Sequence, residues 1–285
     1  MIGFVIPLAR EANELLPFIE DRQEKHFQNR TFYEGKIGCA QCVVVVSGHG
    51  KILSAASTQH LISHYSPDWV LHMGSGGALS SQLKIGDFVI GEKIIEHDYI
   101  ERFCKRRNQP TSVSDQVLIQ KLSHYASCVG KVLHKGKIIS GNEDVVETSR
   151  RDLLFAEYGG LSVDWESCAC ATVCNQARTP VLVVRAITDY AYENTTNEYS
   201  THAGNVNKLL SEFLVGFIKS VVDFLPHMFF TPFVLFFTLD NFCSSNPCAW
   251  FGEQDFFWNT NDKFWVRHTG FSYIIFLGRE LAWLA

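Results

Sequence analysis

The chain has 285 residues, of which 46 % are hydrophobic and 19 % are charged, so it can bury a substantial core and is not expected to be largely disordered. Its formal net charge of −5 excludes the broad basic face that a nucleic-acid-binding protein needs. Charged residues interrupt the apolar start at Arg10, Glu11 and Glu14, so no secretory signal is expected and a cytoplasmic location is the default.

Short β-branched runs alternate with longer amphipathic stretches up to about Leu225, which is the pattern of strands joined by helices. The predicted strands are Ile2–Ile6, Cys42–Val46, Trp69–Met73, Phe88–Ile94, Lys131–Ile139 and Val181–Ile187. The predicted helices are Glu11–Glu20, Ile52–Tyr65, Asp115–Cys128, Val145–Glu157, Ser167–Ala177 and Val206–Phe224. The strand runs are apolar without alternation, which indicates burial on both faces. The pattern predicts an α/β fold, a three-layer αβα sandwich with a mixed central sheet, and a ligand site at the carboxyl ends of the strands.

The composition changes after Pro226. Residues 226–285 hold 12 of the 22 phenylalanines and four of the six tryptophans, without a sustained period. The apolar run MFFTPFVLFFTL contains Pro232 and is shorter than the ~20 residues of a membrane span. Three explanations stay open: a tail that contacts a membrane or a partner, a packed extension of the domain, or sequence not selected for the fold. We therefore expect a domain at 1–225 and an aromatic-rich tail of unassigned role at 226–285.

The chain has nine cysteines, an odd number without the spacing of a disulfide scaffold, so most are expected to be reduced core residues. Cys168, Cys170 and Cys174 fall on one predicted helix. No second Cys or His pair lies nearby in the sequence, so the three thiols indicate core packing rather than a zinc site.

Two glycine-rich segments follow predicted strands: SGHGK at Ser47–Lys51 and HMGSGGAL at His72–Leu79. Glycines let the backbone turn sharply and let a ligand approach the main chain, where N–H groups and the Ser75 hydroxyl can bind hydroxyls or anions. The spacing fits neither the dinucleotide-binding nor the Walker pattern. Two such turns at one sheet edge indicate a ligand site there.

Two further segments place acids at element ends. In SVDWESCACA, Asp164 and Glu166 stand at the start of a predicted helix, where capping is the ordinary explanation. In VVRAITD, Arg185 and Asp189 are expected to flank the carboxyl edge of the last strand, which ends between them. A buried ion pair is the alternative explanation for that arginine and aspartate.

The consecutive order of these motifs resembles the purine nucleoside phosphorylase and hydrolase superfamily, and most of all its methylthioadenosine/S-adenosylhomocysteine nucleosidase branch. The motifs are Ile2-Gly3 with Glu11 downstream, SGHGK, GSGGAL, IGDFVIGEKIIEHDY, ISGNEDV, VDWESCACA and VVRAITD. The resemblance spans roughly residues 1–225 and implies that family's fold. Nothing after Pro226 belongs to it.

The resemblance implies cleavage of the bond between ribose and a purine. In that reaction Asp189 would protonate the purine N7 as the bond breaks, which requires a raised pKa in a partly desolvated site. Glu11 would hold the attacking water, and Glu166 would bind the ribose hydroxyls. The remaining substrate-binding residues that the resemblance implies are Ser75, Gly76, Val145, Trp165 and Arg185, the last of which would orient the carboxylates. No cofactor and no metal is implied, and a homodimer is expected.

The choice between water and phosphate depends on cationic donors. The family's phosphorylases place an arginine where this chain has His72, and Arg10 stands beside Glu11, whose charge would repel phosphate. Hydrolysis is therefore favoured. A phosphorylase and a non-catalytic nucleoside-binding or storage protein remain the alternatives.

Two departures from the nucleosidase pattern concern the substrate. Trp165 replaces a methionine that packs on the ribose, and the ring that stacks on the purine is replaced by Asn142, Glu143 and Asp144. The candidates to supply another ring are Tyr99, Phe103 and Tyr190. The EHDY segment, Glu96–Tyr99, is a candidate wall for the 5′ side of the sugar. A loop histidine with satisfied hydrogen bonds is the alternative interpretation of His97.

Overall fold

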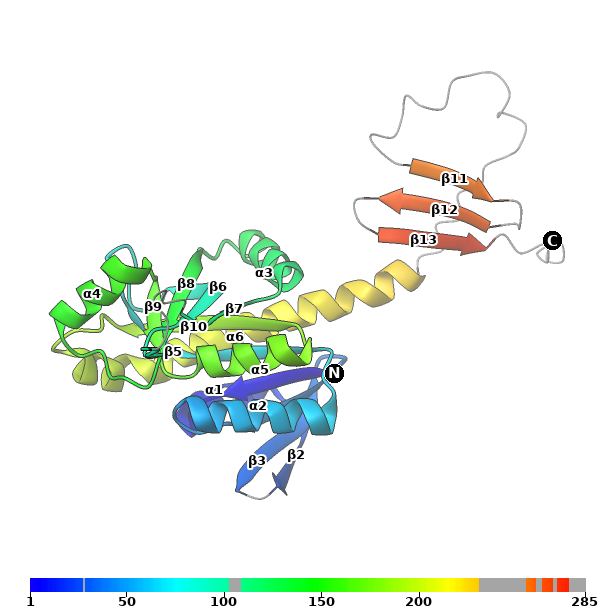
Figure 1. Cartoon of the computed structure of the whole chain (residues 1–285). Helices are drawn as coiled ribbons and strands as arrows, with labels where there is room; N and C mark the ends of the chain where they lie inside the picture. Colours follow the sequence, from blue (N-terminus) through cyan, green and yellow to red (C-terminus); the bar gives the residue numbers. More distant parts are fainter. Residues whose placement is uncertain (28, 103–108, 231–254, 260–262, 269–270, 277–285) are drawn as a thin grey trace, which may run out of the picture. The chain divides into compact units, whose positions relative to one another are not determined.

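The computed structural model describes residues 1–27, 29–102, 109–230, 255–259, 263–268 and 271–276. Contacts within the chain divide it into two compact units, Met1–Thr231 and Pro232–Ala285 (Figure 1). The described part of the second unit is an antiparallel sheet of β11 (Asp255–Asn259), β12 (Lys263–His268) and β13 (Phe271–Phe276). These strands lie in the aromatic-rich segment. Most of its apolar run lies outside the described residues.

The first unit contains a ten-stranded mixed sheet in the order β10-β6-β8-β9-β5-β1-β4-β3-β2, with β7 on β6. The strands are β1 (Ile2–Ile6), β2 (Glu20–Phe27), β3 (Arg30–Ile37), β4 (Ala40–Val46), β5 (Trp69–Ala78), β6 (Phe88–Glu96), β7 (Thr111–Val113), β8 (Leu133–Ser140), β9 (Ser162–Asp164) and β10 (Val181–Asp189). Because β10 also pairs with β5, five strands close into a ring: β5, β10, β6, β8 and β9.

Helices cover both faces of this sheet (Figure 1). They are α1 (Ala9–Leu15), α2 (Lys51–Tyr65), α3 (Gln116–Cys128), α4 (Thr148–Tyr158), α5 (Ser167–Ala177) and α6 (Thr195–Phe230). One buried cluster joins α1, α3 and α6 to the sheet, and a second joins α2 and α5 to its other face. Neighbouring residues of β1 enter opposite clusters, Phe4 the first and Val5 the second. The predicted three-layer αβα sandwich is confirmed.

The three cysteines of α5 lie in the second cluster. Cys168, Cys170 and Cys174 are at most 3 % exposed, and all three are free thiols. The interpretation of these residues as core cysteines is therefore confirmed. Among the described residues, no group of three His, Cys, Asp or Glu side chains has a geometry that could hold a metal ion.

The glycine-rich segment after Met73 is a continuation of β5 to Ala78, not the turn that the sequence predicts. Its glycines leave room for functional side chains. A Cβ at Gly74 would lie 2.6 Å from Nη1 of Arg185, and one at Gly77 would lie 2.9 Å from Oδ1 of Asp189. Likewise, β10 runs through both Arg185 and Asp189 and does not end between them, so that prediction is wrong.

Several element boundaries also differ from the prediction. The first helix ends at Leu15 and is followed by a short 3₁₀ turn, Leu16–Phe18, and then by β2, whose eight residues are all exposed. The hairpin of β2 and β3 projects from the sheet edge (Figure 1) and was not predicted, nor were the three-residue strands β7 and β9. Helix α4 begins three residues later than predicted, and α6 begins eleven residues earlier and runs on to Phe230.

The expected boundary after residue 225 falls inside α6. In the part of the chain that the structure describes, no helix has both the length and the apolar character of a membrane span.

Candidate active site

A cleft of about 340 Å³ opens where several strands of the first unit end, a volume within the ~300–1,000 Å³ of small-molecule sites. The segments that follow β1, β4 and β9 line it, together with the last residues of β5 and β10. The predicted position at the carboxyl ends of the strands is therefore found for the parallel strands β1, β4, β5 and β10.

Seven of the eight residues predicted for the site line this cleft: Glu11, Ser75, Gly76, Val145, Trp165, Glu166 and Asp189. The eighth, Arg185, is only 1 % exposed and is not among the lining residues. Side chains that are far apart in the sequence are thus brought together around one space of nucleoside size.

Asp189 is 5 % exposed at the end of β10. Burial raises the pKa of its carboxyl above the ordinary value. Hydrogen bonds from the Thr188 hydroxyl at 2.8 Å, the Ala191 N–H at 3.0 Å and the Thr195 hydroxyl at 3.3 Å act in the opposite direction but do not cancel the effect of burial. The carboxyl therefore retains its proton to higher pH than an exposed aspartic acid.

Glu11 lies in the first turn of α1 and is 2 % exposed. Its Oε1 accepts the Ser75 N–H at 2.8 Å and its Oε2 accepts the Leu8 N–H at 3.2 Å. Each carboxylate oxygen has two lone pairs, so both oxygens can still accept a hydrogen bond from a molecule in the cleft. The side chain is held in one orientation and is suited to fixing a water there.

The two acids before α5 have different roles. Asp164 caps the helix, because its Oδ1 accepts the N–H groups of Glu166 at 3.1 Å and Ser167 at 2.9 Å. Glu166 makes no capping bond and instead accepts the Gly50 N–H at 2.8 Å, which ties α5 to the start of α2. Burial raises the pKa of Glu166, and the nearby Arg185 opposes that shift. Capping therefore explains Asp164 and leaves Glu166 directed to the cleft.

Arg185 is in a buried ion pair, but its partner is Asp164 and not Asp189. Its Nε donates to Oδ2 of Asp164 at 2.6 Å. Its Nη2 lies 2.5 Å from Nε2 of His72, whose Nδ1 lies 2.8 Å from the Val5 carbonyl oxygen. Because that carbonyl can only accept, Nδ1 carries the hydrogen and Nε2 accepts from the guanidinium. The arginine is fixed from two sides behind the wall of the cleft.

Three supporting contacts of the site were not predicted. His72 and Asp164 contact Arg185 across 113 and 21 positions of the chain, and Asn207 of α6 donates to the Ser75 hydroxyl at 2.8 Å across 132 positions. Such pairs depend on the tertiary fold, and no local pattern identifies them.

A family model of the phosphorylase superfamily matches residues 1–221 of the chain. The chain belongs to the phosphorylase superfamily.

Known members of the superfamily resemble the chain over most of its length. It is 29 % identical over 231 residues to the 5'-methylthioadenosine/S-adenosylhomocysteine nucleosidase of Staphylococcus carnosus (strain TM300), which covers 78 % of this chain and 100 % of that protein. It is 31 % identical over 195 residues to the corresponding nucleosidase of Haemophilus influenzae (strain PittEE), with 66 % and 85 % covered. The solved nucleosidase of Neisseria meningitidis in complex with methylthio-immucillin-A superposes with a TM-score of 0.72 at 25 % identity, with 77 % and 98 % covered.

The rings found at the cleft of this phosphorylase-superfamily member do not include the candidates for stacking on the purine. Tyr99 and Tyr190 are not among the lining residues, and Phe103 lies outside the described residues. The cleft is bordered by Trp165, one of the predicted site residues, which stacks on the imidazole of His49 with 4.1 Å between ring centres. It is also bordered by Tyr199 of α6, which was not predicted.

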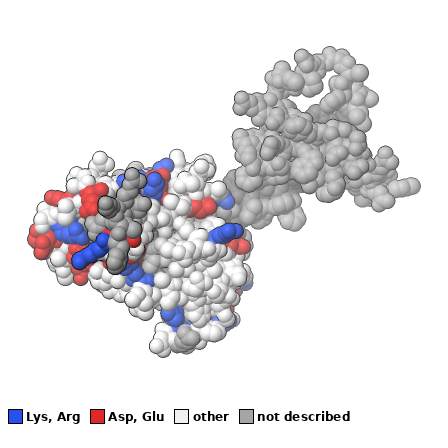
Figure 2. Space-filling view, in the orientation of Figure 1, with Lys and Arg blue, Asp and Glu red and all other residues white. Residues whose placement is uncertain are grey.

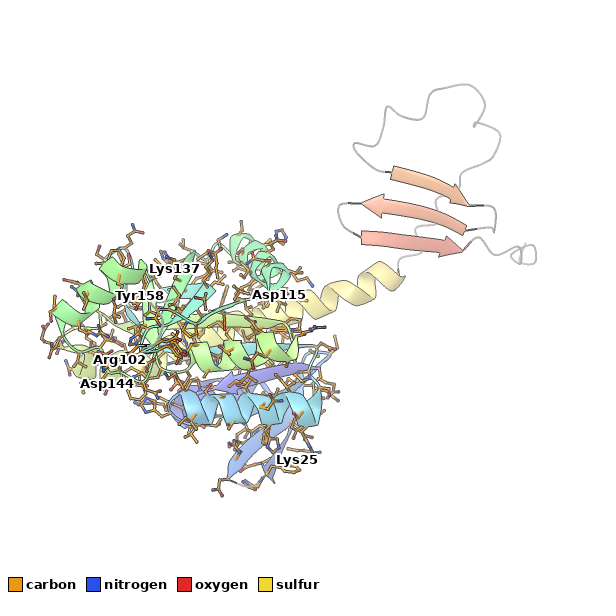
Figure 3. The ribbon with its side chains drawn as sticks, in the orientation of Figure 1. Lys25, Arg102, Asp115, Lys137, Asp144 and Tyr158 are labelled. Atoms are coloured by element: carbon orange, nitrogen blue, oxygen red, sulfur yellow. The ribbon has the colours of Figure 1, made fainter. Side chains whose placement is uncertain are left out.

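The loop between β8 and α4 contributes Glu143, Asp144 and Val145 to the cleft; Asp144 is labelled in Figure 3. Arg150 holds Glu143 with two hydrogen bonds of 2.6 and 2.7 Å. Lys137 of β8 and Tyr158 of α4, also labelled in Figure 3, are joined by a 2.7 Å bond from Nζ to the carbonyl oxygen. The first contact holds the loop to α4, and the second holds the last residue of α4 to β8.

The segment Glu96–Tyr99 does not line the cleft, so its predicted role as a wall is wrong for this cleft. Glu96 and Asp98 instead each accept a 2.6 Å hydrogen bond from Nζ of Lys51. His97 is 5 % exposed, and its Nδ1 lies 3.6 Å from Oε2 of Glu143, too far for a hydrogen bond. Neither ring nitrogen has a hydrogen-bond partner among the described residues, so the interpretation of His97 as a loop histidine with satisfied hydrogen bonds is also wrong. Burial lowers the pKa of His97.

Proposed function

We propose that this chain hydrolyses the N-glycosidic bond of a purine nucleoside, specifically a 5′-substituted adenine nucleoside such as methylthioadenosine or S-adenosylhomocysteine. The observation that carries the proposal is the convergence of Glu11, Glu166 and Asp189 on one cleft, with the pKa of Asp189 raised by burial. The nucleosidases named above support the same substrate class.

The three acids divide the reaction between them. As the bond between C1′ and the purine nitrogen breaks, its electron pair passes to the base, and Asp189 donates a proton to N7. The sugar acquires oxocarbenium character, and a water held by Glu11 attacks C1′ while its proton passes to that carboxylate. Glu166 accepts hydrogen bonds from the ribose hydroxyls, which a charged acceptor binds more strongly than a neutral one does.

The other lining residues position the nucleoside. The Ser75 hydroxyl and the Gly76 backbone border the sugar, Val145 provides an apolar surface for the base, and the indole of Trp165 packs beside the ribose. Arg185 acts from behind the wall: the guanidinium keeps the negative charges of Asp164 and Glu166 compatible with burial.

Water is favoured over phosphate because His72, which stands where the family's phosphorylases have an arginine, supplies no donor to the cleft. His72 is fully buried and is engaged by Val5 and Arg185. The second candidate, a phosphorylase, is supported by Arg10, a cationic side chain that does line the cleft.

The assay uses the purified full chain with methylthioadenosine, S-adenosylhomocysteine or adenosine in phosphate-free buffer. Free adenine and the free sugar are expected from at least the first two, at a rate that added phosphate leaves unchanged. Formation of ribose 1-phosphate dependent on added phosphate would assign the phosphorylase activity instead. Binding in a calorimeter without release of base would leave a nucleoside-binding protein.

We propose that the chain forms a homodimer in the cytoplasm. Figure 2 shows a largely uncharged area over α2 and α5. At the start of α2, the side chains Ile52 and Leu53 are 80 % and 47 % exposed, which is typical of a contact surface. The free thiol of Cys128 is exposed, which suits a reducing compartment.

Replacing Ile52 by glutamate is expected to convert the dimer to a monomer, because a charge would be buried at the contact. Light scattering coupled to size-exclusion chromatography measures the mass. Leu209→Glu is the control, since Leu209 is 42 % exposed on α6, on the other face of the sheet. A monomeric wild-type chain, or equal dissociation by both variants, would contradict the proposed interface.

A further inference from the structure

One cationic side chain in the wall of the cleft lacks an acidic partner. Arg10 lines the cleft next to Glu11 in the sequence and is exposed. Its guanidinium carbon lies 4.3 Å from the centre of the Tyr199 ring. No carboxylate among the described residues forms an ion pair with it. Because a guanidinium stacked on a ring by its face keeps its N–H groups free at the edge, Arg10 is prepared to bind an anion.

The other cations around the cleft are already neutralised. Arg150 is bound by Glu143, Arg185 by Asp164, and Lys51 by Glu96 and Asp98. The lining itself contains several acids and, apart from Arg10, no other lysine or arginine. An anionic group on a ligand would therefore be repelled in most of the cleft and attracted close to Arg10.

Contacts with helix α6 locate the guanidinium of Arg10 relative to Asp189. Thr195 donates to Asp189, and Tyr199, under the guanidinium of Arg10, follows four residues later on the same helix. Four residues advance a helix by about 6 Å. Arg10 is thus displaced along α6 from Asp189, the acid that would protonate the base.

In a nucleoside, C5′ lies at the end of the ribose away from the base. With the base at Asp189, a 5′ substituent extends toward the part of the cleft bordered by Arg10. We propose that Arg10 binds a carboxylate at the end of the 5′ substituent, so that this chain prefers nucleosides with an anionic 5′ chain to those with a neutral one. The inference rests on the proposed function and adds a residue that determines its substrate specificity.

A single carboxylate suits this position better than free phosphate does. Arg10 supplies one positive charge, and the neighbouring Glu11 carboxylate is buried and held by two N–H groups. A phosphate dianion close enough to attack C1′ would face that carboxylate. A carboxylate on a flexible 5′ chain can reach the guanidinium from the far side, away from Glu11.

The test compares two substrates that differ only in charge: 5′-(2-carboxyethylthio)adenosine and its amide. The wild-type chain is expected to favour the acid by about fivefold in kcat/KM at low ionic strength, the size of an exposed ion pair. The preference should shrink in 1 M salt. In Arg10→Gln the ratio of acid to amide should fall to about 1. Because both substrates are assayed with the same variant, an effect of the substitution on folding or on the chemical step lowers both kcat/KM values equally and leaves their ratio unchanged.

Arg22→Gln is the matched control, because Arg22 is also exposed and its guanidinium lies 5.9 Å from a tyrosine ring, that of Tyr33, outside the cleft. This variant should keep the wild-type ratio. A wild-type ratio of 1 or less, an unchanged ratio in Arg10→Gln, or base release that requires phosphate would overturn the inference. If neither substrate releases adenine, the proposed function fails, and the ratio of the two dissociation constants by calorimetry then decides the role of Arg10.

Discussion

Replacing Asp189 by asparagine is expected to lower kcat for base release by about 10²–10⁴, because the amide keeps the shape of the side chain but cannot donate a proton to N7. The wild-type rate should fall as pH rises through the pKa of Asp189, which burial raises. The variant should lack this alkaline limb. Adenine release measured across pH tests both points, and an undiminished rate in the variant would contradict the assignment.

A measurement of stability distinguishes a loss of proton donation in Asp189→Asn from a loss of folding. The folded pKa of Asp189 lies above its ordinary value of 3.8, so ionisation of the buried carboxyl destabilises the folded chain as pH rises through that folded pKa. Asparagine stays neutral, so the variant is expected to be at least as stable as the wild type at pH 7. Thermal unfolding followed by circular dichroism measures this. A melting temperature lowered by many degrees would mean that the lost activity reports unfolding instead.

The second large effect is expected from Arg185→Met, which should lower the free energy of unfolding by about 3–5 kcal/mol, because it leaves the Asp164 carboxylate buried without its partner. Both side chains are at most 2 % exposed, so solvent screening does not weaken this pair. Urea unfolding at pH 7 measures the loss. The matched variant is Arg185→Met with Asp164→Asn, which removes both charges and keeps an oxygen to cap α5, so it should recover part of the stability.

The pH dependence of this pair runs opposite to that of Asp189. Burial alone would raise the pKa of Asp164, but Arg185 and the hydroxyls of Ser167 and Ser140 outweigh it and hold the pKa below the ordinary 3.8. The stabilisation is therefore fully present above pH 3.8 and is lost as pH falls through the lower folded pKa. The difference in the free energy of unfolding between the wild type and Arg185→Met should disappear only at acidic pH. A gap that is constant down to pH 2 would contradict the ion pair as its cause.

The buried strands and the layers of this fold could be predicted because each depends on local apolar runs. The β2–β3 hairpin could not, since β2 carries eight exposed and mostly polar residues with no apolar alternation. The first eleven residues of α6 were missed for the same reason: residues 195–205 are largely polar. An edge strand and a helix start on the surface need no apolar pattern, so their sequences do not show one.

Residues of the candidate site were predicted where a motif marks them, as at Glu11, Glu166 and Asp189. Their supports were not, because His72, Asp164 and Asn207 act through contacts that exist only in the folded chain. The glycines after Met73 were taken for a turn because glycine is disfavoured in strands. In the structure these glycines make room for Arg185 and Asp189, a tertiary reason that outweighs the local preference.

The ring of β5, β10, β6, β8 and β9 has a consequence for how the molecule acquires activity. Ser75 lies within β5, Glu166 follows β9, and Asp189 is the last residue of β10, so these site residues meet only when the first and the last strands of the ring have paired. A fragment that ends before β10 lacks Asp189, so it is expected to release no base.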